Sequence, residues 1–433
     1  MNCRTKIFLS ILFSVSAFIA TAQVPKQLDL KQSIDLSIKN SGAIHIADAR
    51  ILQASAEVRA AKDRALPDAK ISGSYLRLSG ANVDLKNNNG GGTKAPTVNQ
   101  AIYGIANITY PIYAGGRIRY GIESAKYLEQ AVKLNAENDK EAIIYNTILA
   151  YANLYKAGKT VSVIEESLKA SIQRDTTFSR LEQNGLLTRN DLLKSQLQTS
   201  NIELSLLDAQ SDLSIANVNM ALMLGLPEET KFIIDSSFVS AKQDLLPFLQ
   251  TERLALEKRK DIQALGFERK AAALGVKSAK AETYPSLALT GGYIAADIPK
   301  FISITNAVNV GIGLQYDLSS LWKTNTKLQQ ARVRETILSV NESQINDAVR
   351  LQVNIDYQNY LLTQKKIEVF DKAIAQAQEN YRITKNKYDN SLVTITDLLE
   401  ADVALLQTKL KAASARADAA LAYNKLLQTT GTL

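Results

Sequence analysis

Hydrophobic and polar residues alternate most regularly along the segment 306–318. Apolar side chains occupy every second position there, and small or polar side chains lie between them. A period of two predicts a β-strand with one apolar face, and this strand is long enough to cross a membrane at a tilt. The apolar positions are Val308, Val310, Ile312, Leu314, Tyr316 and Leu318. We expect the first four of them to face lipid.

Three further segments predict strands of the same kind. Residues 100–113 repeat the alternation more weakly, and segments 68–85 and 286–297 supply the other member of each strand pair. Four strands are too few to close a membrane barrel, which needs about eight, and lipid does not tolerate open sheet edges. If these strands cross a membrane, several chains must share one barrel.

The segments 117–184 and 323–390 predict two very long helices. Both lack proline and are rich in residues that favour helices, such as alanine, leucine, lysine and glutamate. At about 1.5 Å per residue each helix would extend roughly 100 Å, too far for the interior of an ordinary globular domain. After a short break each is followed by a shorter predicted helix, at 188–223 and 394–428.

Apolar and small residues recur every seven positions in the two shorter helices, in two parallel rows. Such rows predict close, coiled-coil packing against neighbouring helices. The lengths also indicate that two short helices stacked end to end line one long helix. We pair 188–223 with a helix near 254–283, and 394–428 with a helix near 42–66. The rows include Leu193, Leu197, Leu204 and Leu207 in the first helix, and Leu399, Val403, Leu406 and Leu410 in the second.

The second half of the chain repeats the first. Residues 110–225 match 316–431 without a gap at a shift of 206 positions, so that Tyr110 falls on Tyr316. A second matching pair, Leu66-Pro67-Asp68 and Tyr284-Pro285-Ser286, marks the start of the strands at a slightly larger offset. A period this long indicates one duplicated structural unit. We divide the chain into a first repeat at 23–225, a connecting segment at 226–253 and a second repeat at 254–433.

Residues 1–22 have the pattern of a secretory signal peptide. Arg4 and Lys6 precede an apolar stretch, and Ala20-Thr21-Ala22 fits the cleavage site. Cys3, the only cysteine, lies ahead of the apolar stretch, so we expect an exported chain that is not lipidated. After the signal there is no apolar run of about 18 residues, so any membrane crossing must use the strands.

Charge and composition point away from several other functions. The formal net charge of +8 is spread along the predicted helices and forms no basic cluster with aromatic residues, so we expect no nucleic-acid partner. The single histidine, His45, cannot form a metal cluster or a catalytic triad. The glycine-rich stretch at 90–92 lies in a loop and not between a strand and a helix. We expect no enzyme activity, no metal and no cofactor.

Together, the signal peptide, the duplicated order of helices and strands, and the turns at 184–191 and 390–397 resemble the TolC-like outer membrane efflux proteins. The resemblance covers essentially the whole mature chain. It implies a mainly α-helical fold with a β-barrel part. In such a fold, long antiparallel coiled coils would form a periplasmic tunnel, and three chains would contribute four strands each to a twelve-stranded barrel. The resemblance also implies an equatorial region, for which the connecting segment 226–253 and the N-terminal residues near 24–40 are the candidates.

The same resemblance implies a passive exit channel in the lipid of the outer membrane. The channel would be a homotrimer, and its partners would be a periplasmic adaptor protein and an inner-membrane transporter of the RND, ABC or a similar class. Efflux and type I secretion both fit. An exported structural coiled-coil protein without a pore is the alternative, but such a protein has no need of the alternation at 306–318.

The family resemblance also implies roles for residues in the two turns. Asp397 and Glu400 match the acidic residues that narrow the pore, although Asp397 could instead only cap its helix. Asp191 and Tyr388 match partners in the contacts that close the tip, whereas Val393 stands where the family has an arginine. Arg189 or Lys194 could replace that arginine. The positions that match the docking site of the adaptor are Gly185, Leu186, Leu392 and Val393.

Overall fold

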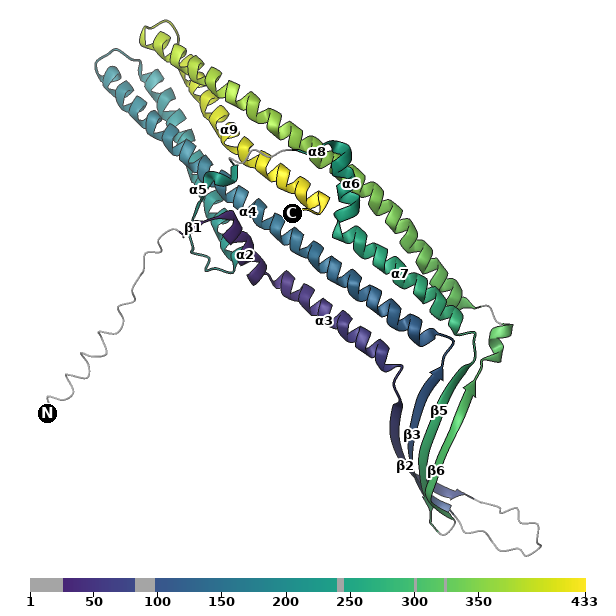
Figure 1. Ribbon diagram of the computed structural model, residues 1–433. Coiled ribbons are helices and arrows are strands. Elements are labelled where there is room, and N and C mark those ends of the chain that lie inside the picture. Colours follow the sequence, from purple (N-terminus) through teal and green to yellow (C-terminus); the bar gives the residue numbers. More distant parts are fainter. Residues whose placement is uncertain (1–25, 82–97, 240–244, 300–301, 323–324) are drawn as a thin grey trace, which may run out of the picture.

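The computed structural model is an elongated molecule with a β-sheet at one end and two helical hairpin turns at the other (Figure 1). It describes residues 26–81, 98–239, 245–299, 302–322 and 325–433. The predicted signal peptide and the end of the first predicted strand, 82–85, lie outside the described residues. The elements are β1 Lys26–Leu28, α2 Leu30–Asn40, α3 Gly42–Asp63, β2 Asp68–Ala81, β3 Val98–Tyr113, α4 Arg117–Gln183, α5 Arg189–Leu224, β4 Phe232–Ile234, η1 Ser236–Val239, α6 Phe248–Lys258, α7 Lys260–Ala281, β5 Ser286–Ile298, β6 Ile302–Gln315, η2 Leu318–Leu321, α8 Thr326–Asp389 and α9 Ile395–Thr430.

The four long strands form one antiparallel sheet in the order β2-β3-β5-β6. Their register places Ile312 opposite Leu289 and Val308 opposite Tyr293, so the apolar positions of neighbouring strands share one face. Both outer strands, β2 and β6, have one edge without a partner strand among the described residues. The sheet is therefore a strip with two open edges.

The strand predicted at 306–318 starts earlier and ends earlier than its alternation indicates. It runs from Ile302 to Gln315, and Leu318 belongs to the 3-10 turn η2. A local hydrogen bond explains the early end, because the backbone N–H of Ser319 donates to Asp317 Oδ1 at 3.0 Å and starts the turn. Tyr316 and Leu318 therefore lie beyond the end of β6.

The two long helices are α4 and α8, and each packs along most of its length against shorter helices. In the half near the hairpin turns, α4 lies between α5 and α9, and in the half near the sheet it lies between α3 and α7. α8 packs mainly against α9, α7 and α6. The helices thus form a wall with α5 and α3 at one edge and α8 at the other (Figure 1).

The short helices stack end to end, but not in the pairs that their lengths indicated. The C-terminal end of α5 meets α2, where Asn40 Nδ2 donates to the carbonyl of Leu224 at 2.6 Å. The end of α9 meets the break between α6 and α7, where Arg259 Nη1 donates to the carbonyl of Thr429 at 3.4 Å. α5 therefore stacks on α2 and α3, and α9 stacks on α6 and α7. The predicted pairing was wrong because helix length does not say which ends meet.

The two heptad rows also differ in where they lie. In α9, Leu406 and Leu410 pack against a buried cluster formed by α4 and α5. In α5, Leu197 and Leu204 are 65% and 60% exposed, and the face toward α4 is formed by other residues, including Leu192 and Ile202. The prediction that the rows of α5 pack against a neighbouring helix is wrong within this chain, because α5 lies at the edge of the wall.

The main hydrophobic core lies near the middle of the molecule, where the parallel pair β1–β4 covers α4. Tyr151 of α4 is 1% exposed, and its hydroxyl donates to the carbonyl of Leu28 at 3.0 Å. Burial raises the pKa of Tyr151 to about 12, so the phenol stays neutral and keeps its hydrogen bond. The segment predicted to be equatorial, 226–253, supplies β4, η1 and the start of α6.

Candidate functional site

The two hairpin turns have the same backbone geometry. Gly185 and Ser391 occupy matching positions with φ of 74° and 58°, the left-handed conformation that ends many helices. The residue after each, Leu186 or Leu392, is 74% or 73% exposed at the tip of its hairpin. Val393 is half-buried behind Leu392. The turns therefore present two exposed leucines at the end of the molecule farthest from the sheet.

Asp397 begins α9 as part of a capping box. Its carboxylate accepts hydrogen bonds from the backbone N–H and the hydroxyl of Thr394, at 2.8 and 2.6 Å, and its own N–H donates to Thr394 Oγ1 at 3.3 Å. The hydrogen bonds from Thr394 hold the pKa of Asp397 below its ordinary value of 3.8. The capping role that competed with the pore role at the sequence level is therefore real. It keeps the carboxylate charged and does not bury it.

Glu400 lies one turn further along α9, on the surface. It lines a groove of about 520 Å³ between α5 and α9, together with Lys194 and Thr396. Lys194 Nζ donates to Thr396 Oγ1 at 3.5 Å across this groove. The structure brings Glu400 and Lys194 to one groove that joins the two hairpins.

Asp191 and Tyr388 lie on different hairpins, but they are close enough for the charge of Asp191 to act on the Tyr388 phenol. The carboxylate of Asp191 accepts one hydrogen bond from the hydroxyl of Thr188, at 2.8 Å, and Asp191 starts α5 much as Asp397 starts α9. Tyr388 packs against Phe178 with ring centroids 5.6 Å apart. Burial, and then the charge of Asp191, raise the pKa of the Tyr388 phenol. Arg189, one candidate for the missing arginine, instead lies 4.0 Å from Glu182 of its own hairpin.

A buried polar cluster joins the two hairpins further from the tips, and the sequence analysis missed it. Arg174 of α4 donates from Nη1 to Asp402 Oδ2 of α9 at 2.6 Å, and the two side chains are 10% and 17% exposed. Arg174 also donates from Nε to Ser195 Oγ at 3.2 Å and from Nη2 to Ser171 Oγ at 2.9 Å. Ser195 in turn donates to Asp175. One guanidinium thus holds α4, α5 and α9 together.

No pattern in the sequence marks this cluster. Arg174 and Asp402 are 228 positions apart, and each lies in a helix that is rich in charged residues. The repeat does not help either, because the position that matches Arg174 at the 206-residue shift is Asn380 and the one that matches Asp402 is Gln196. The ion pair joins the two repeats, and its equivalent positions, Asn380 and Gln196, carry no charges that could form a second one.

The apolar face of β6 is fully open in the single chain. Val308, Val310, Ile312 and Leu314 are 72%, 79%, 72% and 68% exposed. The register extends this face across the other strands through residues such as Leu289, Tyr293, Ile108 and Ile71, while residues such as Asn309, Gly311, Thr290, Asn107 and Ser72 lie on the opposite face. The sheet is therefore a strip with one apolar and one small or polar face.

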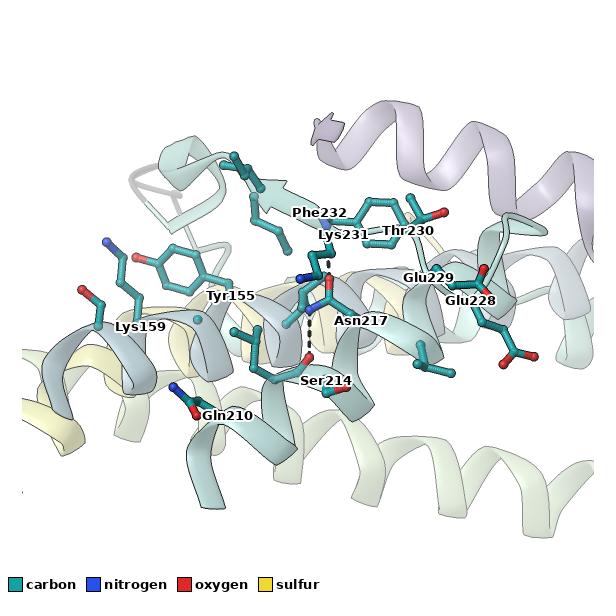
Figure 2. A pocket seen from close by; sticks show the side chains of 17 residues that line it. Tyr155, Lys159, Gln210, Ser214, Asn217, Glu228, Glu229, Thr230, Lys231 and Phe232 are labelled. Carbon is teal, nitrogen blue, oxygen red and sulfur yellow. Dashed lines mark hydrogen bonds between the residues drawn. The ribbon is translucent and has the colours of Figure 1, made fainter. Parts of the chain in front are cut away.

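A second hollow lies at the middle of the molecule, between α4, α5 and the β4 segment. Its volume is about 710 Å³, and Lys159, Gln210, Glu228 and Lys231 are among its lining side chains (Figure 2). Asn217 ties its walls together, since its Nδ2 donates to the carbonyl of Leu213 at 2.9 Å and its Oδ1 accepts from the N–H of Phe232 at 3.1 Å. These bonds fix β4 on α5.

Within the described ranges, no helix combines the length and the apolar character needed to cross a membrane. The same ranges contain no group of three or more histidine, cysteine or acidic side chains that could hold a metal ion. Three surfaces described above are the candidate sites: the hairpin tips, the groove at Glu400 and the apolar face of the sheet.

Known structures share this fold. The outer membrane protein VceC of Vibrio cholerae has a TM-score of 0.77 at 19% identity, over 93% of this chain and 96% of that one. The CmeC outer membrane channel of Campylobacter jejuni has a TM-score of 0.79 at 17% identity, over 93% of this chain and 85% of that one. The fold is thus that of the TolC-like channels.

The sequence comparisons agree with the fold. The outer membrane efflux protein BepC of Brucella suis biovar 1 (strain 1330) is 20% identical over 99% of this chain and 90% of its own length. The family model described as "Outer membrane efflux protein" matches residues 33–226 and 253–432, which make up most of the chain. The protein therefore belongs to the outer membrane efflux protein family.

Proposed function

We propose that the protein is a passive exit channel in the outer membrane, formed by three copies of the chain. An inner-membrane transporter of the RND, ABC or a similar class would deliver the substrate, and a periplasmic adaptor would connect the two, for efflux or type I secretion. The observation that carries the proposal is the four-stranded sheet, which has one apolar face and two open edges.

The open edges argue for several copies of the chain. An unpaired backbone N–H or carbonyl in lipid costs several kcal/mol, so a membrane sheet has to close on itself. Closure needs about eight strands or more, and the described part of one chain supplies four. Three copies would give twelve strands, the number that the family resemblance implies. The apolar face with Val308 and Ile312 would then meet lipid, and the face with Asn309 and Gly311 would line the lumen.

The helical wall supports the same assembly. Its two edges carry exposed apolar residues, such as Leu204 and Leu207 on α5 and Ile355, Leu362 and Val369 on α8, all between 51% and 62% exposed. Rows of exposed leucine along a helix favour a helical partner. A ring of chains covers both edges at once and extends the barrel into a tunnel.

The hairpin tips would be the periplasmic end of this tunnel. Asp397 and Glu400 are both exposed near the start of α9, and three copies of each would place rings of carboxylates at the narrowest point of the lumen. Leu186 and Leu392, which protrude from the turns beside Gly185 and Val393, would meet the adaptor. Asp191 and Tyr388, which interact electrostatically across the two hairpins, would take part in closing the tip.

Two measurements on the purified protein test the proposal. Outer-membrane fractionation followed by a gel without heating should give a heat-sensitive oligomer, and the same material should conduct ions in a planar lipid bilayer. A soluble exported coiled coil would give neither result. A protein that stays in the soluble periplasmic fraction and forms no pore would therefore contradict the channel.

A further inference from the structure

A hollow lies at the junction between the helical wall and the sheet, where α3, α4 and α7 meet the ends of β3 and β5 (Figure 1). Its volume is about 490 Å³. Arg64, directly after α3, and Arg117, at the start of α4, both line it. The lining residues that carry hydroxyl groups are Tyr113, Ser278 and Ser286. The hollow therefore combines two cationic groups with several hydrogen-bonding groups.

The two arginines are cations without a partner in the described part of the chain. Neither guanidinium has a hydrogen bond or an ion pair with any residue of that part. Other basic side chains near the junction are paired: Arg119 Nε lies 3.1 Å from Glu123 Oε1, and Lys70 Nζ lies 2.7 Å from Asp68 Oδ2. An unpaired guanidinium offers several N–H donors in a planar fork that matches the oxygens of carboxylate and phosphate groups. The hollow thus has free donors for an anion.

One carboxylate also lines the hollow, but a cation outside the lining offsets its charge. Glu282, at the end of α7, accepts a hydrogen bond from Lys327 Nζ of α8 at 2.7 Å. Lys327 is not among the lining residues. With Glu282 paired in this way, the two arginines leave a net positive charge in the hollow.

The hollow reaches the polar face of the sheet. Ser286 and Ala288, which line it, alternate with the apolar positions of β5 and share the face of Thr290. Leu287 and Tyr113, which pair on the apolar face, also border the hollow where the strands end. The polar face is the one that lines the lumen in the proposed channel.

The layer formed by β1 and β4 indicates the same side of the wall. Ile148 of α4 packs in the core beneath this layer, and Gly121 of α4 lines the hollow. The two residues are 27 positions apart, about 7.5 turns at 3.6 residues per turn, so they face opposite sides of α4. A layer of strands inside a tunnel would obstruct it. In the proposed ring the layer therefore lies outside, and the hollow faces the lumen.

We propose that this hollow is a binding site for anionic solutes, with Arg64 and Arg117 as the groups that hold them. The ligand class is a solute with two or more clustered carboxylate or phosphate groups, because two guanidinium groups line one hollow of this size. The place of the site in a lumen rests on the proposed function. The hollow itself is complete in one chain.

The site gives the channel a second charged position, opposite in sign to the first. Asp397 and Glu400 would favour cations at the tips, whereas the arginines favour anions at the entrance to the barrel. Beyond the hollow, the polar face of the sheet carries uncharged side chains such as Asn107, Thr290 and Asn309. An anionic solute that has passed the tips is therefore expected to dwell at the arginines before it leaves through the barrel.

Titration calorimetry with pyrophosphate tests the site on the detergent-solubilised protein, without the need for a pore. The original protein should bind pyrophosphate. Arg64→Gln and Arg117→Gln should each weaken binding by at least about tenfold, because each removes charge-assisted hydrogen bonds to the anion. Arg119→Gln is the matched control, since Arg119 is two positions from Arg117 but pairs with Glu123 and does not line the hollow. This control should change the affinity by less than about threefold.

Glu282→Gln supplies a gain of binding that misfolding cannot imitate. The substitution removes the carboxylate from the hollow and releases Lys327. Pyrophosphate should therefore bind about two- to fivefold more tightly, the range expected for a partly exposed charge. Unchanged or weaker binding in Glu282→Gln would overturn the proposal. So would an affinity that Arg64→Gln and Arg117→Gln leave unchanged, or that Arg119→Gln lowers equally.

Bilayer recordings separate the anion site from the channel. Pyrophosphate added on the barrel side should reduce the conductance of the original protein, relative to its conductance in KCl alone, and should reduce that of Arg64→Gln with Arg117→Gln much less. If both proteins form pores and pyrophosphate acts on them equally, the inference fails and the channel stands. If calorimetry shows the expected losses but the original protein forms no pore, the anion site stands and the proposed channel fails.

Discussion

Replacement of Arg174 by leucine should loosen the contact between the two hairpins near their tips. The guanidinium donates to Asp402, Ser195 and Ser171, and the Arg174 and Asp402 side chains are 10% and 17% exposed. Leucine fills much of the same space but donates no hydrogen bond. The carboxylate of Asp402 is then left largely buried without its charge partner, which is what makes the loss of one member of a buried pair costly.

The size of the effect follows from the burial of this pair. Exposed ion pairs contribute about 0–1 kcal/mol, whereas breaking a buried pair by removing one partner costs about 3–5 kcal/mol. The residual exposure of Asp402 favours the lower end, about 3 kcal/mol, which corresponds to roughly a hundredfold change in a local opening equilibrium. The change should be confined to the region near Arg174, Ser195 and Asp402.

Hydrogen exchange measured by mass spectrometry is the assay, under conditions where exchange reports the opening equilibrium. Amides of α9 around Asp402 and of α5 around Ser195 should exchange about a hundredfold faster in Arg174→Leu. Lys385→Leu is the matched control, because the pair Lys385–Asp389 is 52% exposed at both side chains. It should change exchange by less than about fivefold. Adding Asp402→Leu to Arg174→Leu should recover much of the protection, since no buried charge is left unpaired. An Arg174→Leu protein whose exchange matches that of the control would refute the reasoning.

Three further outcomes are expected at the sheet and the tips. Ile312→Arg should lower the yield of heat-sensitive oligomer in the outer membrane, because an arginine facing lipid costs about 2–4 kcal/mol of insertion free energy. Gly311→Ser should lower this yield only slightly, because the nearest atom to an added Cβ is 3.9 Å away. Equal losses of yield in the two variants would contradict the assigned faces. Glu400→Gln with Asp397→Asn should reduce cation preference in bilayer recordings; unchanged ion selectivity would remove both from the constriction. In Glu400→Gln alone, the remaining preference for cations should persist as the pH falls to about 5. The reason is that the pKa of Asp397 lies below 3.8, so its charge and its capping are lost only as the pH falls through that lowered value. Loss of the cation preference already at pH 6 would contradict this.

Periodicity made the elements predictable. The alternation from Val308 to Leu314 and the proline-free segments gave the strands and the long helices to within a few residues. The alternation alone could not show that Asp317 begins a turn, so the strand was extended too far. Local patterns of this kind predict secondary structure well, because the backbone hydrogen bonds of a helix and the alternating faces of a strand relate residues that are close in the chain.

Contacts between distant elements were less predictable. The heptad rows of α5 and α9 look alike in sequence, yet Leu410 is partly buried and Leu204 is exposed, because only α9 has helices on both sides. Nothing in the sequence relates Arg174 to Asp402. The place of Asp397 at the start of a helix is compatible with capping and with the pore role that the family resemblance implies, and the hydrogen bonds to Thr394 establish the capping role.

The number of chains in the assembly is the most direct test of the central claim. Native mass spectrometry of the protein extracted from the outer membrane, on a preparation that also forms pores in bilayers, gives this number without any variant. The open edges of β2 and β6 and the exposed rows on α5 and α8 predict more than one copy of the mature chain, and the family resemblance implies three. A pore-forming preparation in which only one or two copies are found would contradict the account.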